Sequence, residues 1–170
     1  HLISLEKRKK ILNFDFDKIL KKNIKWKFLY FSEKKNKLNK LIDLIKVFAI
    51  AFKICISNQV KSIHCRGFHP AIIGLILSFF FKSKLIFDMR GFWIDEKVDN
   101  NFINKSKLFD KLFFNFLKKI ENIIFKKSFH IVVLTHKIKN FLIKEKKLNE
   151  KKISVICCSV DYDLFANISK

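Results

Sequence analysis

Two arginines carry the most specific chemistry in this chain. Only three of the 36 basic residues are arginine, and Arg66 and Arg90 each open the tripeptide Arg-Gly-Phe. A guanidinium holds a phosphate or carboxylate through a fixed fork of donors, whereas a lysine is a mobile point charge. The pattern therefore predicts that these arginines contact an anionic group of a ligand. The alternative is a structural role, with Arg90 paired to one nearby acid among Asp88, Asp95 and Glu96.

The rare residue types of the chain gather around these arginines. An apolar run ends at Asp88 and is followed at once by Arg90 and Trp93, which is typical of a site at the end of a strand. His69 follows the first Arg-Gly-Phe closely and precedes the only proline, so it is a candidate ligand contact. The glycines, the proline and the methionine of the whole chain all lie between positions 66 and 91: Gly67, Gly74, Gly91, Pro70 and Met89.

Length and composition indicate one globular domain. The chain has 170 residues, of which 49% are hydrophobic, enough to bury one core. The net charge of +21 comes almost entirely from lysine in a chain that is also rich in Asn, Ile and Phe. That composition suggests a coding bias and a solvated lysine surface, while weak contact with an anionic membrane is the functional alternative.

Cysteine spacing and the length of the apolar runs indicate the cellular compartment of the protein. The four cysteines form no C-x-x-C pair and no zinc-like spacing, so reduced thiols in a cytoplasmic protein are expected. The longest apolar run, from Ala71 to Phe81, is well short of the roughly 20 residues that span a membrane. We expect a cytoplasmic protein, and any membrane contact would be peripheral, at the inner face of the cell membrane.

The periodicity predicts alternating strands and helices. Helices need a repeat near 3.6 residues and strands a repeat of two or a short apolar run. Such alternation favours an α/β fold with a parallel sheet, Rossmann-like, with helices on both faces. Arg66, Arg90 and Thr135 would then follow strands at one edge of the sheet, and Thr135 can cap the helix after it. The expected strands are 1–6, 26–31, 62–65, 85–87, 131–134 and 153–156, the expected helices are 38–55, 71–81, 108–124 and 136–147, and a polar loop is expected through 104.

The other sequence motifs give little information about function. The chain has no G-x-G-x-x-G, P-loop or G-x-S-x-G sequence, which excludes nicotinamide dehydrogenase, P-loop NTPase and serine hydrolase chemistry for it. The D-x-D triplets at 15–17 and 161–163 resemble metal-holding motifs of some sugar transferases, and we interpret both as chance matches. No histidine pair has helical metal-ligand spacing, so no metal site is predicted.

Four segments carry a resemblance to a known family. In order and spacing, they look like the N-terminal domain of glycosyltransferase 4-like enzymes of the GT-B fold. The segments are IHCRGFHPAIIGLIL, LIFDMRGFWIDEKVD, FHIVVLTHKIKNFL and ISVICCSVDYDLF. The resemblance implies a Rossmann-like half of a two-domain retaining transferase that mainly shapes the acceptor side of the cleft.

The resemblance also implies the substrates and the residues that bind them. The donor would be a nucleotide-sugar, with no other cofactor, and the acceptor a glycan or lipid-linked glycan of surface polysaccharide or glycolipid synthesis. Residues 1–160 would form the domain, without the family's first strand and glycine loop, and 161–170 would begin the linker to an absent C-terminal domain. No catalytic residue is assigned. The substrate-binding residues carried over are Arg66, His69, Asp88, Arg90, Trp93 and Thr135.

Two hypotheses about function therefore remain, one an enzyme and the other a binding domain. The preferred one is a glycosyltransferase (EC 2.4 type), although this segment alone is expected to be inactive because the donor-binding half is missing. The alternative is a basic nucleic-acid-binding or other phosphate-binding α/β domain without catalysis. The chain lacks an RNP-like aromatic strand, a zinc module and an arginine-rich patch, so nucleic acid is not expected as a partner.

Overall fold

The computed structural model describes residues 1–6, 24–30 and 37–158. The contacts divide the chain into two compact units, His1–Val60 and Lys61–Lys170, and each is described by itself. The prediction of one domain over residues 1–160 stays a prediction, and the proposed linker at 161–170 lies outside the described residues.

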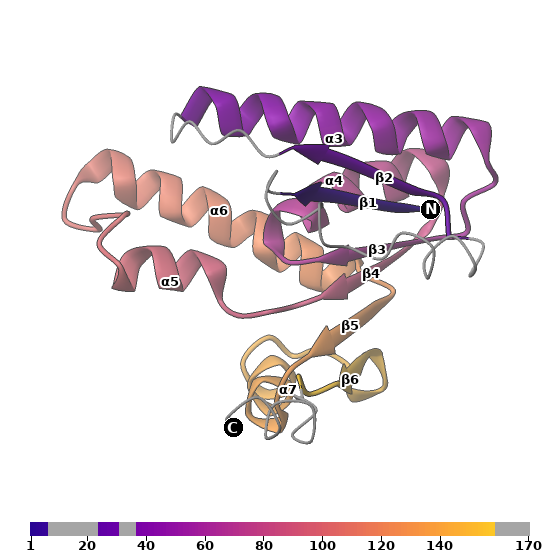
Figure 1. The fold of residues 1–170 in the computed structure, drawn as a ribbon. Helices are drawn as coiled ribbons and strands as arrows, with labels where there is room; N and C mark the ends of the chain where they lie inside the picture. The colour runs from indigo at the N-terminus through magenta and orange to yellow at the C-terminus, as the bar shows by residue number, and fades with distance from the viewer. Residues whose placement is uncertain (7–23, 31–36, 159–170) are drawn as a thin grey trace, which may run out of the picture. The chain divides into compact units, whose positions relative to one another are not determined.

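The first unit holds two strands and a long helix. Strands β1 (Leu2–Glu6) and β2 (Trp26–Tyr30) pair in parallel, and helix α3 covers Lys37–Ser57 (Figure 1). The indole Nε1 of Trp26 donates a hydrogen bond of 2.8 Å to Ser4 Oγ across the strand pair. These elements match the strands and the helix that periodicity predicts for this part of the chain.

The second unit is a four-stranded parallel sheet flanked by helices. Its strands lie in the order β3-β4-β5-β6, which is also their order in the sequence. The α/β class, the parallel sheet and its helical flanks are thus confirmed, and the fold is Rossmann-like. The strands are β3 (Ser62–Arg66), β4 (Lys84–Asp88), β5 (His130–Val133) and β6 (Ile153–Val155); the helices are α4 (Phe68–Phe81), α5 (Trp93–Asp99), α6 (Leu108–Lys127), α7 (His136–Lys144) and the 3-10 turn η1 (Glu150–Lys152).

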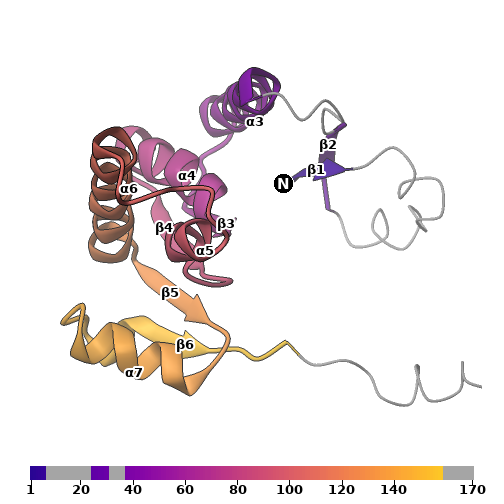
Figure 2. The same ribbon diagram turned by 90° about the vertical axis from the view of Figure 1, so that its left-hand side faces the viewer.

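One face of this sheet carries the core. Cys65, Phe87, Ile131 and Ile153 are aligned across the four strands, and all are buried. Helices α4 and α6 pack against this row and against each other, as Figure 2 shows, and α7 packs on β5 and β6. Because side chains alternate along a strand, the row starting at Arg66 points to the opposite face.

Helix α4 approaches the sheet closely through a glycine. A Cβ at Gly74 would overlap Cys65 Sγ and lie 2.9 Å from Leu85 Cδ1. A larger residue there would push the helix off β3 and β4. The glycine therefore helps to fix how tightly α4 packs on the strands that end at Arg66 and Asp88.

Two sequence-based expectations are wrong. The polar loop expected through Asn104 contains helix α5, whose first turn carries Asp95 and Glu96, acids that favour a helix N-terminus. The apolar stripe expected to be the core face of α6 is mostly exposed, and only its Leu117 and Ile124 are buried. None of the helices in the described ranges is long and apolar enough to cross a membrane.

Candidate functional site

The candidate site lies at the carboxyl edge of the sheet in the second unit. All four strands run in the same direction, so the residues that follow them share this edge. Arg66 ends β3, Arg90 follows β4, Thr135 follows β5 and Cys158 follows β6. Ligands of open α/β sheets bind at such an edge, so these residues form the candidate site.

A buried aspartate and a half-exposed arginine form the centre of the site. Asp88 is 4% exposed and is the last residue of β4. Its Oδ2 accepts a hydrogen bond of 2.6 Å from Nη2 of Arg90, whose side chain is 32% exposed. The hydrogen bond to Asp88 raises the pKa of Arg90. The pairing that sequence analysis offered as the structural alternative for Arg90 is therefore present.

Arg90 also connects strands that are not neighbours. Its Nη1 donates a hydrogen bond of 2.9 Å to Sγ of Cys158, which lies 68 positions along the chain. Since β5 separates β4 from β6, this hydrogen bond joins the segments that follow two strands that are not neighbours. Sequence analysis missed Cys158, and no spacing or period in the last segment pointed to it.

Two polar atoms in this pair have no partner among the described residues. Asp88 Oδ1 and Arg90 Nε are both buried, and neither makes a hydrogen bond there. A buried polar atom left unpaired costs about 1 to 3 kcal/mol, so native proteins rarely keep one without a reason. One atom is an acceptor and the other a donor. A hydroxyl group both donates and accepts, so hydroxyl groups can pair with either atom.

His64 adds a second titratable side chain to the site. Its Nε2 lies 3.8 Å from Oδ2 of Asp88, and its side chain is 60% exposed. His64 is two residues before Arg66 in β3, so both side chains point to the face opposite the core. The sequence analysis did not name His64 among the site residues. The strand alternation with Arg66 was the signal that could have found it.

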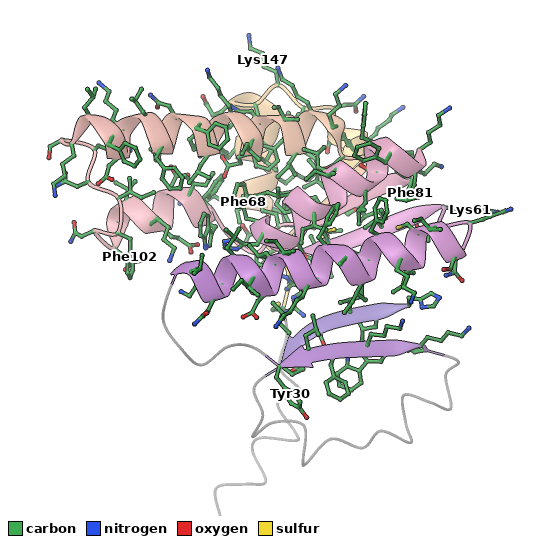
Figure 3. The ribbon with its side chains drawn as sticks, turned by 90° about the horizontal axis from the view of Figure 1, so that it is seen from above. Tyr30, Lys61, Phe68, Phe81, Phe102 and Lys147 are labelled. Carbon is green, nitrogen blue, oxygen red and sulfur yellow. The ribbon has the colours of Figure 1, made fainter. Side chains whose placement is uncertain are left out.

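An aromatic group borders the site beside α4. The ring of Trp93 stacks on Phe68 with centroids 5.2 Å apart, and the imidazole of His69 meets Trp93 edge-on at 4.4 Å; Phe68 is labelled in Figure 3. His69 and Trp93, both predicted site residues, are thus in direct contact. Their packing ties the start of α4 to the start of α5, and so it fixes the two segments that follow β3 and β4.

Gly67 controls how the chain leaves β3. Its φ of 89° lies in the region that L side chains rarely adopt, which explains glycine at this position. Its N–H donates to the carbonyl oxygen of Asp88 at 2.9 Å, and its own carbonyl accepts from Ala71 N at 3.2 Å. The turn therefore places exposed Arg66 beside Asp88, its partner in the strand register.

Thr135 caps the N-terminus of helix α7. Its Oγ1 accepts a hydrogen bond of 3.2 Å from the backbone N–H of Ile138, which confirms the predicted cap of α7. The structure thus brings Asp88 with Arg90 and His69 with Trp93 into direct contact. Arg66 lies in register with Asp88, and no contact joins Thr135 to the other predicted residues among those described.

No metal centre is found in the part of the chain that the structure describes. No group of three His, Cys, Asp or Glu side chains there could hold an ion. The D-x-D triplets at 15–17 and 161–163 lie outside the described residues. All four cysteines are free thiols, with Cys55 and Cys65 buried and Cys157 and Cys158 exposed.

No protein-family model matches the chain, and a search of curated proteins finds no matching relative.

Proposed function

We propose that this chain forms the acceptor-side half of the cleft of a retaining, nucleotide-sugar-dependent glycosyltransferase. Its substrate would be a glycan or lipid-linked glycan of surface polysaccharide or glycolipid synthesis. The sequence resemblance described above supports the proposal, and so does a Rossmann-like sheet with polar residues at its carboxyl edge. In such an enzyme the nucleotide-sugar would be held mainly by a second domain.

The unpaired atoms of Asp88 and Arg90 carry the proposal. An acceptor sugar presents hydroxyl groups, which can donate to Asp88 Oδ1 and accept from Arg90 Nε. Both atoms are buried, so a hydroxyl reaches them only when the ion pair opens. Movement of Arg90 breaks its hydrogen bonds to Asp88 and Cys158, so contacts with the acceptor must offset the loss of these bonds.

The same geometry disfavours the phosphate-binding alternative. A phosphate bound by Arg90 would lie next to the carboxylate of Asp88, and like charges this close repel. The second positive candidate, Arg66, sits in register with that same carboxylate. The charge at this edge is therefore mixed, which suits a neutral polyhydroxyl ligand better than a nucleic-acid backbone.

An acceptor-dependent assay tests the proposal. The chain would be produced together with its adjoining coding sequence and incubated with a panel of nucleotide-sugars, with and without free and lipid-linked glycan acceptors. Release of nucleoside diphosphate should depend on an acceptor. Asp88→Asn should lower kcat/KM for the acceptor at least tenfold, while the slow hydrolysis of donor without acceptor stays unchanged.

Asp99→Asn provides the matched control, because Asp99 is an exposed acid at the end of α5. We expect that variant to transfer sugar like the unmodified protein. Absence of turnover with every nucleotide-sugar would overturn the glycosyltransferase proposal. Equal effects of the Asp88 and Asp99 substitutions would remove Asp88 from the acceptor site.

A further inference from the structure

Helix α6 exposes an unusually large apolar surface for a helix that also packs on a core. Phe109 is 79% exposed and Leu108 is 74% exposed, although both belong to the stripe that periodicity assigns to the core. The buried residues of α6 lie from Leu117 onward, so the first half is left to expose its apolar side chains. The exposed apolar residues of α6 are Leu108, Phe109, Leu112, Phe113, Phe116 and Ile123.

These side chains form one continuous face. At 3.6 residues per turn, the six positions fall within an arc of about 140° around the helix axis. Leu117, Glu121 and Phe125 lie outside this arc and are buried against the rest of the unit. We call the six exposed residues the α6 apolar face. Figure 3 shows α6 along its length, with aromatic side chains standing along it.

Exposed lysines accompany the apolar face, and exposed acids do not. Lys111, Lys119, Lys126 and Lys127 are all exposed on α6. The two acids of the helix are unavailable. Asp110 is half-buried and accepts the N–H of Asn104, and Glu121 is buried beside Lys118.

Lys118 has a different role from the other lysines of α6. Its Nζ donates to Asp95 at 2.8 Å and to Glu121 at 2.5 Å, and its side chain is 20% exposed. Burial lowers the pKa of Lys118, but the hydrogen bonds to the two acids outweigh it, and the pKa is raised overall. Lys118 therefore links α5 to α6, and its charge is already paired with two acids. It is not one of the lysines that we expect to contact lipid.

We propose that the α6 apolar face inserts into the headgroup region of an anionic membrane, with the exposed lysines of the helix contacting lipid phosphates. A helix with Phe and Leu on one face and lysines around it is the usual composition of helices that lie in the membrane plane. Protein interfaces are depleted in lysine, so a protein partner fits this surface less well. The net charge of +21 adds long-range attraction to anionic lipid. The inference does not depend on the proposed sugar transfer.

Vesicle sedimentation tests the proposal directly. The 170-residue chain would be mixed with vesicles of phosphatidylcholine alone and of phosphatidylcholine with about one third phosphatidylglycerol, at low and at physiological salt. Because both the apolar face and the lysines contribute, we expect binding to the anionic vesicles and at least tenfold weaker binding to the neutral ones. Phe109→Ser combined with Phe116→Ser should lower the anionic partition coefficient at least tenfold.

A matched pair of single variants separates this face from general hydrophobicity. Ile123→Ser removes an exposed isoleucine from the α6 apolar face, and Ile156→Ser removes one of similar exposure after β6. We expect only Ile123→Ser to weaken binding. Since these side chains are exposed, circular dichroism should show unchanged folding. If the double variant misfolds, the two single variants still test the proposal.

Charge is tested in the same assay. Lys119→Gln with Lys126→Gln should weaken binding several-fold more than Lys46→Gln with Lys53→Gln, two exposed lysines of α3 that give the same change in net charge. Two results would overturn the proposal. One is binding that all of these variants keep at the unmodified level; the other is a dimer, seen by sedimentation equilibrium without lipid, that the Phe109 and Phe116 changes dissociate.

Discussion

At the residue scale, Asp88 and Arg90 combine a structural contact with unsatisfied hydrogen-bonding capacity. The ion pair explains how a carboxylate can be buried at the end of β4. It leaves Asp88 Oδ1 and Arg90 Nε unpaired, and a purely structural pair gains nothing from that. The sequence could predict both residues, because an arginine in a lysine-rich chain stands out. It could not predict which of the three nearby acids Arg90 would choose, because that choice depends on the turn after β4.

The first prediction separates the two roles of Arg90. Arg90→Lys keeps the positive charge but loses the fixed fork of donors, so under the proposed transferase function we expect folding to survive and transfer to weaken. Loss of one charge-assisted hydrogen bond costs roughly 1.5 to 3 kcal/mol, which at about 1.4 kcal/mol per tenfold is a drop in kcat/KM of about ten- to a hundredfold. Thermal melting and transfer rate would be measured on the same variant. A lower Tm with normal turnover per folded molecule would assign Arg90 to structure alone.

The second prediction concerns thiol reactivity. Burial raises the pKa of Cys65 to about 12, so almost none of this thiol is ionised at pH 8. Iodoacetamide should therefore modify the exposed Cys157 and Cys158 and leave Cys65 untouched until urea unfolds the chain. Mass spectrometry of the peptides measures this. Rapid labelling of Cys65 in the folded chain would contradict its packing against Gly74.

The same shift has a consequence for stability at high pH. The folded-state pKa of Cys65 is above its ordinary value of 9.0, so the folded state retains a proton that the unfolded chain loses. The contribution of this thiol to stability is then fully present below pH 9, and it is lost as pH rises toward 12.

At the scale of elements, sequence periodicity predicted most strands and helices correctly. It did not predict which of their apolar faces are buried. Short apolar runs gave the sheet, because a strand covered by helices reads as a continuous apolar segment. Helix α5 was missed because its seven residues, Trp93–Asp99, make only about two turns, too few to show a period. The stripe on α6 was recognised, but its exposure was not. A period shows that one face is apolar, and only the packing shows whether protein covers that face.

The third prediction tests how α6 is held at its C-terminal end. Lys152 Nζ donates to the carbonyl oxygens of Phe125 and Lys126 at 2.9 and 2.8 Å, which places a cation on the last turn of the helix. Burial lowers the pKa of Lys152. Lys152→Met should destabilise the chain by about 0.5 to 2 kcal/mol in urea unfolding, because two helix carbonyls lose their partner and the helix dipole loses its charge.

The neighbouring lysine is the control for this experiment. Lys151 is exposed and its side chain makes no such contact, so Lys151→Met should leave the free energy of unfolding within about 0.5 kcal/mol of the unmodified value. Equal effects of the two substitutions would show that the Lys152 contacts do not stabilise α6.

At the scale of the whole molecule, the buried cluster is built from one continuous part of the sequence. Its members and the half-buried residues packed on it run from Ile63 to Val155. In the four-stranded sheet the order of the strands follows their order in the chain, so the segments between its strands connect neighbours. The sequence could predict the alternation that produces this pattern. It could not predict that the contacts divide at Val60, because length and composition are those of a single domain.

The last prediction follows from that continuity. A chain of residues 61–170 should fold without the first unit, because the buried cluster is supplied by residues 63–155. We expect a single cooperative thermal transition, followed by circular dichroism, with a Tm within about 5 °C of the corresponding transition in the full chain, which is about 1 kcal/mol for a domain of this size. Ile131→Ala in the shorter chain is the control, because Ile131 is fully buried and its truncation should cost about 2 to 5 kcal/mol. If residues 61–170 melt without a cooperative transition, the core of the second unit depends on the first. If they melt cooperatively but Ile131→Ala leaves the transition unchanged, then the observed transition does not report the packing of β5 between β4 and β6.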